Sequence, residues 1–164
     1  MAQEGMKDLD SRAWRAFHAI GQQLIPHLGR QISHHSGLTP AEYVVLLALY
    51  ESESPTLSVN ELATRLGWEI SRMSHQVTRM HDGGLLNKRR SGIDSRCFDV
   101  KLTPRGRNRI ARAIPLQSIE INHCFSDILT TAQMKTLIEI SEAISEHLLE
   151  NHPMSQRSST QKAS

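Results

Sequence analysis

The apolar spacing of this chain changes from a helical to an extended period near residue 85, and this change restricts the fold more than any other feature. Before it, apolar side chains recur every three or four residues, which is the spacing of helices with one buried face. After it, residues 96–102 alternate apolar and polar side chains, and a glycine-containing loop at residues 91–95 separates them from another extended run at residues 86–90. A short loop joins the two extended runs, and apolar and polar side chains alternate in the second run. This pattern predicts a β-hairpin.

Two short helices with a tight turn between them are expected directly before the hairpin. Ser58 and Glu61 form a capping box, in which each side chain bonds the backbone N–H of the other residue, and the box opens a helix over residues 58–66. Gly67 marks the turn, and a second helix runs from about residue 69 to residue 82. A helix-turn-helix followed at once by a hairpin predicts a winged helix-turn-helix, a DNA-binding motif.

Longer helices are expected before this motif. Apolar positions at steps of three and four predict a first helix from residue 12 to about residue 36, ended by Gly37. Pro26 lies inside it and lacks a backbone donor, so we expect a kink near residues 22–26. A capping box at Thr39–Glu42 opens the next helix.

The helices after the hairpin complete the expected fold class, which is mainly α with a small β-hairpin wing. Thr103-Pro104 starts one helix, Pro115 should kink it, and a capping box at Thr130–Gln133 starts the last helix. The first and last helices have apolar faces too large for one small winged-helix core to cover, so we expect them to form a helical dimerisation region. We expect a flexible N-terminus at residues 1–10 and a disordered tail at residues 153–164. The dimerisation region takes residues 11–36 and 104–150, and the winged helix-turn-helix lobe takes residues 37–103.

The charge of the chain is unevenly distributed. Residues 65–112 hold twelve Lys and Arg against four acids, a net charge of +8, whereas residues 1–64 and 113–164 each carry −3. A basic middle third indicates a polyanionic partner such as nucleic acid. The alternative is a basic surface that is only solvated.

Composition excludes several classes of protein. The longest apolar run has eight residues, Tyr43 to Tyr50, and a membrane span needs about 20, so we expect no contact with a membrane. The N-terminal sequence lacks the basic-then-apolar order of a signal peptide, and two cysteines favour a reducing cytoplasm. No phosphate loop or nucleophile motif is present, which argues against an enzyme and against a catalytic or cofactor site.

The second short helix has two contrasting faces. Its apolar residues share one face: Met73, Val77 and Met80. The opposite face carries hydrogen-bonding and cationic side chains: Ser71, His75 and Arg79, with Arg72 and Thr78 at its edges. Such side chains can bind guanine edges or phosphates, and the face has no acid before Asp82. A solvated helix face is the alternative, but it would normally mix both signs of charge.

Four stretches of the sequence resemble the MarR family of bacterial transcriptional regulators. They are Gly67 to Leu86 (GWEISRMSHQVTRMHDGGLL), Lys88-Arg89-Arg90, Asp94-Ser95-Arg96, and the run from Val100 through Leu102-Thr103-Pro104-Arg105 to Gly106. The specific part of the pattern is an Asp-x-Arg wing followed by Leu-Thr-x-x-Gly. The resemblance covers about residues 10–150.

This resemblance implies a homodimer that binds a palindromic operator in double-stranded DNA, and we expect a repressor. Its subunits interlock through the first helix and the last two. By the same match, residues 69–82 are the recognition helix, residues 86–102 are the wing, Arg96 enters the minor groove, and Asp94 orients it. Ile70 departs from the pattern, because relatives often carry a polar residue there. The candidate DNA-contacting residues are Ser71, Arg72, Ser74, His75, Gln76, Thr78, Arg79, Lys88, Arg89, Arg90, Asp94 and Arg96.

The resemblance also implies a small-molecule effector. Relatives release DNA when a small, often phenolic anion binds between the dimerisation helices and the DNA-binding lobe. The aromatic and titratable candidates for such a pocket are Trp14, His18 and Tyr43. The alternative is that Trp14 and Tyr43 are ordinary core residues.

Other functions remain open on the sequence. A regulator of the same fold that responds to redox or metal is one alternative: Cys97 lies among cations that lower a thiol pKa, and the chain has nine histidines. The histidines show no His-x-x-x-His spacing, so we expect no metal site. A protein-interaction module that does not bind DNA is the second alternative, and it would leave the basic segment unexplained.

Overall fold

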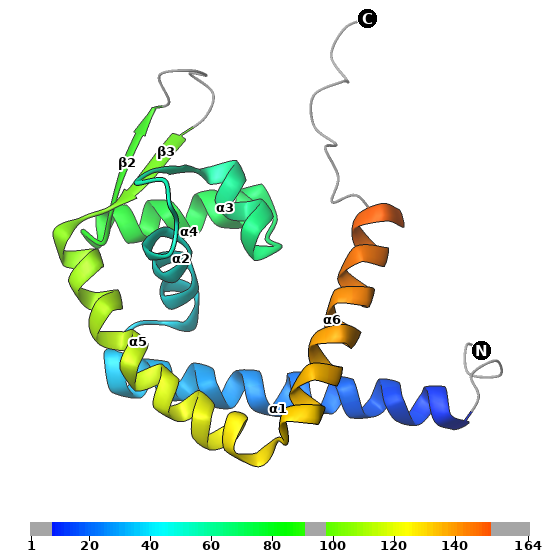
Figure 1. The fold of residues 1–164 in the computed structure, drawn as a ribbon. Helices are drawn as coiled ribbons and strands as arrows, with labels where there is room; N and C mark the ends of the chain where they lie inside the picture. The colour runs from blue at the N-terminus through cyan, green and yellow to red at the C-terminus, as the bar shows by residue number, and fades with distance from the viewer. Residues whose placement is uncertain (1–7, 91–97, 152–164) are drawn as a thin grey trace, which may run out of the picture. The chain divides into compact units, whose positions relative to one another are not determined.

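The computed structural model describes residues 8–90 and 98–151 of the 164-residue chain. Within these residues the chain is mainly helical and carries a small antiparallel sheet, as expected (Figure 1). The chain divides into two compact units between residues 121 and 122. The elements in chain order are α1 (Asp8–Ser36), α2 (Pro40–Tyr50), β1 (Leu57–Ser58), α3 (Val59–Leu66), α4 (Ile70–Asp82), β2 (Leu86–Arg90), β3 (Phe98–Leu102), α5 (Pro104–Cys124), the 3₁₀ helix η1 (Ser126–Ile128) and α6 (Thr131–Asn151).

Local hydrogen bonds set the helix starts that the capping signals predict. In the box before α3, the backbone N–H of Ser58 donates to Glu61 Oε2 at 2.6 Å, and the backbone N–H of Glu61 donates to Ser58 Oγ at 3.2 Å. The same reciprocal pairing links Thr39 to Glu42 before α2. Gly67 ends α3 at φ +63°, a left-handed conformation that strains other residues. The turn between α3 and α4 is therefore specified by residues within it.

One of the expected helix boundaries was wrong. Helix α1 begins at Asp8, four residues before the expected start, so part of the segment expected to be flexible is helical. Asp8 and Asp10 lie in its first turn, where acidic side chains interact favourably with the helix dipole. Helix α1 continues through Pro26, and α5 continues through Pro115 to Cys124.

The sheet contains one strand more than the expected hairpin. Its order is β1-β3-β2, and both pairings are antiparallel. Strand β1 is only two residues long, with Leu57 opposite Val100, and its second residue, Ser58, is also the N-cap of α3. So short a run has no period that a sequence pattern can reveal.

A single apolar core joins α2, α3, α4, the sheet and α5. The expected inward residues of α4 are confirmed, since Met73 and Val77 are 0% exposed and Met80 is 1% exposed. Leu46, Leu62, Val100 and Ile110 are also fully buried in this core: they come from α2, α3, β3 and α5. Helix α4 is thus held from behind by this core.

The Leu-Thr-x-x-Gly segment has a clear structural role at the start of α5. Thr103 Oγ1 accepts a hydrogen bond from the backbone N–H of Gly106 at 2.9 Å, and it lies 2.8 Å from the carbonyl oxygen of Gly84, to which it donates. A Cβ on Gly106 would lie 2.1 Å from the carbonyl oxygen of Leu85. The motif therefore packs the start of α5 directly against the backbone that leads into the hairpin.

Candidate nucleic-acid interface

The outward side of α4 presents the residues expected to contact DNA. Ser71, Arg72, His75, Thr78 and Arg79 are exposed, and Ser74 is half-buried. Residues 70–81 include no acidic side chain. This side of the helix therefore combines hydrogen-bond donors with positive charge.

The two arginines of α4 are held by neighbouring side chains. The guanidinium carbon of Arg72 lies 4.1 Å from the ring centroid of Trp68, a cation–π contact. Arg79 Nη2 donates to Gln76 Oε1. Both arginines line a pocket of about 640 Å³, together with Gln76, Trp68, Leu66 and residues at the start of α2. Sequence reasoning missed Trp68, although it lies one helical turn before Arg72.

Gln76 does not lie on the exposed side of α4, which corrects its place among the expected DNA contacts. Its side chain is 3% exposed. Gln76 follows Met73 by three residues and precedes Met80 by four, so helical geometry places it on the buried face. It positions Arg79 by accepting the hydrogen bond described above.

The hairpin has two different faces. The register pairs Lys88 with Val100 and Arg89 with Asp99, so Lys88 shares the face of the buried Val100 and Arg89 lies on the other face. Arg89 and Arg90 are exposed, whereas Lys88 is half-buried. Of the three basic residues that begin the wing, two are thus free to meet a polyanion.

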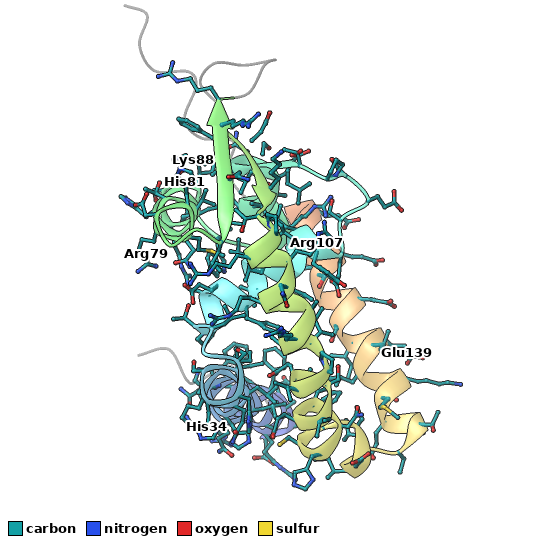
Figure 2. The ribbon with its side chains drawn as sticks, turned by 90° about the vertical axis from the view of Figure 1, so that its left-hand side faces the viewer. His34, Arg79, His81, Lys88, Arg107 and Glu139 are labelled. Carbon is teal, nitrogen blue, oxygen red and sulfur yellow. The ribbon has the colours of Figure 1, made fainter. Side chains whose placement is uncertain are left out.

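Lys88 instead contacts α4 and the opposite strand. Its Nζ donates to Thr78 Oγ1 at 3.0 Å and lies 4.3 Å from the centroid of the Phe98 ring. Close by, His81 Nδ1 lies 3.0 Å from the carbonyl oxygen of Leu86, to which it donates. Figure 2 shows Lys88 and His81 together where the hairpin meets α4.

The wing tip lies outside the described residues. Asp94 and Arg96, expected to contact the minor groove, belong to this segment, as does Cys97. Their roles stay sequence-based predictions. Cys124, the other cysteine, is half-buried at the end of α5.

The three candidate effector residues are divided between two places. The rings of Trp14 and His18 stack with centroids 5.9 Å apart on α1, and Trp14 is 59% exposed. Tyr43 is 7% exposed and lines a small cavity between α1, α2 and α5 that neither Trp14 nor His18 lines. Burial raises the pKa of Tyr43 above its usual value, and the nearby charge of Glu51 adds to this effect.

The cavity beside Tyr43 is polar on one side. Gln117, itself 6% exposed, lines it, and His35 Nε2 lies 3.6 Å from Glu120 Oε1 at its edge. Its free volume is about 10 Å³, which is at most the space of one water molecule. As it stands, this cavity does not hold an aromatic ligand.

In the part of the chain that the structure describes, no helix combines the length and the apolar character needed to cross a membrane.

Comparisons with known proteins agree with this geometry. A sequence profile of the MarR family matches residues 36–96, the region that contains α2, α3, α4 and β2. The HTH-type transcriptional regulator TtmR of Methylorubrum extorquens is 32% identical over 114 residues, which are 65% of this chain. The matched region spans 55% of the length of TtmR.

Two solved structures from Streptomyces coelicolor resemble nearly the whole described chain. The MarR family transcriptional regulator AbsC is 28% identical with a TM-score of 0.82, and the match covers 88% of this chain and 97% of AbsC. Sco3205, a MarR family transcriptional regulator solved in complex with DNA, is 27% identical with a TM-score of 0.85, and the match covers 92% of this chain and 94% of Sco3205. With the winged helix, the basic side of α4 and the Thr103–Gly106 cap, these matches show that the chain is similar over most of its length to the MarR family of winged helix-turn-helix transcriptional regulators.

Proposed function

We propose that this protein is a homodimeric transcriptional repressor that binds a palindromic operator in double-stranded DNA. The observation that carries the proposal is the exposed, acid-free side of α4, with Arg72, His75 and Arg79, next to the exposed Arg89 and Arg90 of the hairpin. Helix α4 is supported from behind by the core and is narrow enough to enter a major groove. The relative Sco3205 was solved in complex with DNA, which supports the same use of this fold.

A second copy of this chain is the proposed partner for the apolar surfaces of α1 and α6. On α1, Trp14, Phe17 and Ile20 are each more than half exposed. On α6, Ile144 and Leu148 are about half exposed, at 47% and 50%. Apolar side chains gathered on helices at this exposure mark an interaction surface. The dimer would present two copies of α4 to two half-sites about 10–10.5 base pairs apart, one turn of the DNA helix.

Selection of binding sequences from a random duplex library tests the function. We expect an inverted repeat to be enriched, and its affinity should fall steeply with salt, because each neutralised phosphate releases counterions. A control duplex of the same composition with shuffled half-sites should bind weakly. Failure to bind duplex DNA even at low salt would show that the basic segment serves another purpose, such as contact with an acidic protein.

We also propose that a small molecule releases the repressor from DNA in the bacterial cytoplasm. The cavity beside Tyr43 must open to admit such a molecule, because its present volume is about 10 Å³. A thermal-shift screen of phenolic acids, metal ions and oxidants, followed by DNA-release assays, tests this. If no compound in these classes shifts the melting temperature or releases the operator, the effector part of the proposal is wrong.

A further inference from the structure

Lys88 differs from the exposed cations of the hairpin, Arg89 and Arg90, because it is half-buried and its ammonium group already contacts two side chains of the protein. Its Nζ donates to Thr78 Oγ1 at 3.0 Å and lies over the Phe98 ring at 4.3 Å from the centroid. The hydroxyl of Thr78 in turn donates to the carbonyl oxygen of Ser74 at 2.9 Å. The proton of Thr78 is therefore committed to the helix, and the lone pairs of its oxygen are left to accept from Lys88.

The strand register explains why Lys88 reaches α4 and its neighbour does not. Lys88 pairs with Val100, and Phe98 lies two residues away on the same face of β3, which is the diagonal position. This face also contains Leu86 and Val100, which are 1% and 0% exposed, so it is the face turned to the core. Arg89 is the next residue and projects from the opposite face.

We propose that Lys88 is a positioning residue that joins the base of the wing to the recognition helix and makes no contact with phosphate. This inference rests on the proposed DNA-binding function. Because α4 and the wing meet different grooves of the DNA, their relative orientation has to match the spacing of those grooves. A bond from β2 to the middle of α4 holds that orientation before DNA arrives, so binding does not have to order it.

Salt dependence separates a positioning lysine from a phosphate contact. The variants are Lys88→Met, which keeps an apolar stem against the Phe98 ring, and Arg89→Met, a matched loss of one charge on the other face. Operator affinity is measured by fluorescence anisotropy over a series of salt concentrations. Lys88→Met should weaken binding about threefold to tenfold, the range of one net hydrogen bond, with an unchanged salt slope. Arg89→Met should reduce the slope by about 0.9, the value of one phosphate contact.

A double-mutant cycle tests the bond itself. Thr78→Val removes the acceptor with little change in shape, so Lys88→Met should have no further effect on affinity in the Thr78→Val variant. The same cycle measured by urea unfolding without DNA should show coupling between the two positions, which also confirms that both variants fold.

Each contrary result overturns the inference in a recognisable way. A salt slope that falls for Lys88→Met as much as for Arg89→Met would mean that Lys88 contacts phosphate. Additive losses for Lys88→Met and Thr78→Val would mean that the bond does not position the wing. If the unchanged protein binds no duplex DNA, the proposed function fails, and the positioning role fails with it. If the unchanged protein binds normally but the affinity losses of the two variants are additive, only the positioning role fails.

Discussion

Arg79 illustrates how one side chain of α4 is prepared for recognition. Its guanidinium donates a hydrogen bond to Gln76, which is itself buried. Arg79 therefore has less conformational freedom than an ordinary surface arginine. A guanidinium that is oriented before binding loses less entropy when it forms paired hydrogen bonds.

Replacing Arg79 should alter which bases are preferred within the half-site. Arg79→Ala should cost about 1–3 kcal/mol of binding free energy and relax the preference at one base pair, because the major groove distinguishes all four pairs. Competition binding against operators with single base changes measures this. The control is Arg112→Ala on α5, which removes an exposed cation outside α4 and the hairpin. An equal loss on all sequences would indicate that Arg79 binds phosphate and reads no base.

Arg96 should have a different effect from Arg79. The sequence predicts Arg96 as the wing arginine, and a lone arginine suits the narrow, negative minor groove of A·T-rich DNA, so Arg96→Ala should cost about 1–3 kcal/mol and relax preference at the flanks of the operator. Asp94→Ala should show a smaller effect of the same kind, because it frees the guanidinium without removing it. The measurement compares an operator with a version whose flanks are shuffled, at one salt concentration. Tighter binding by Asp94→Ala would exclude its role as the orienting partner.

The start of α3 shows how a short element depends on its own cap. The backbone N–H and the hydroxyl of Ser58 hold the pKa of Glu61 below its usual value of 4.5, with the backbone hydrogen bond as the main cause. Because this pKa is lower in the folded state, the carboxylate stabilises the fold above pH 4.5, and the contribution is lost as the pH falls through the lowered folded pKa.

Glu61→Gln should therefore flatten the acid side of the stability profile. The free energy of unfolding, measured with urea between about pH 7 and pH 3, should depend less on pH than in the unchanged protein. Ser58→Ala should lower stability at neutral pH by about 0.5–2 kcal/mol, the usual cost of losing an N-cap. Glu69→Gln is the control, because Glu69 is the N-cap of α4 and makes no capping hydrogen bond with its side chain. If Glu61→Gln and Glu69→Gln gave the same profile, the capping bond would not be the source of the pH dependence.

At the scale of the whole molecule, the exposed apolar side chains of α1 are the proposed contact with a second copy of the chain. Phe17 is 55% exposed, and placing a charge there should disrupt an apolar interface with a second copy. Phe17→Glu should therefore shift the protein from dimer to monomer in sedimentation experiments and weaken operator binding, because one recognition helix cannot span two half-sites.

A variant at Ile70 supplies the matched comparison. Ile70 is 49% exposed on α4, away from α1, so Ile70→Ala removes exposed apolar surface without touching the proposed dimer interface. It should stay dimeric. A Phe17→Glu variant that remained a dimer would move the interface away from α1.

Most of the helix boundaries could be predicted from the sequence because they depend on interactions within a few residues. The capping boxes at Thr39 and Ser58, the left-handed Gly67 and the apolar face of α4 all involve neighbours along the chain. The same holds for the exposed basic side of α4. Even Gln76 carried a local signal, since its spacing from Met73 and Met80 places it on the buried face.

Contacts between distant segments could not be read from these local patterns. Strand β1 exists only because Leu57 meets Val100 across the fold, and Lys88 differs from Arg89 only because its face of the hairpin turns toward Thr78. The cavity beside Tyr43 likewise depends on how α1, α2 and α5 pack together. Hydrogen bonds within one turn of a helix are set by neighbouring residues, whereas the environment of a side chain is set by whichever elements the folded chain places against it, and that arrangement belongs to the tertiary structure.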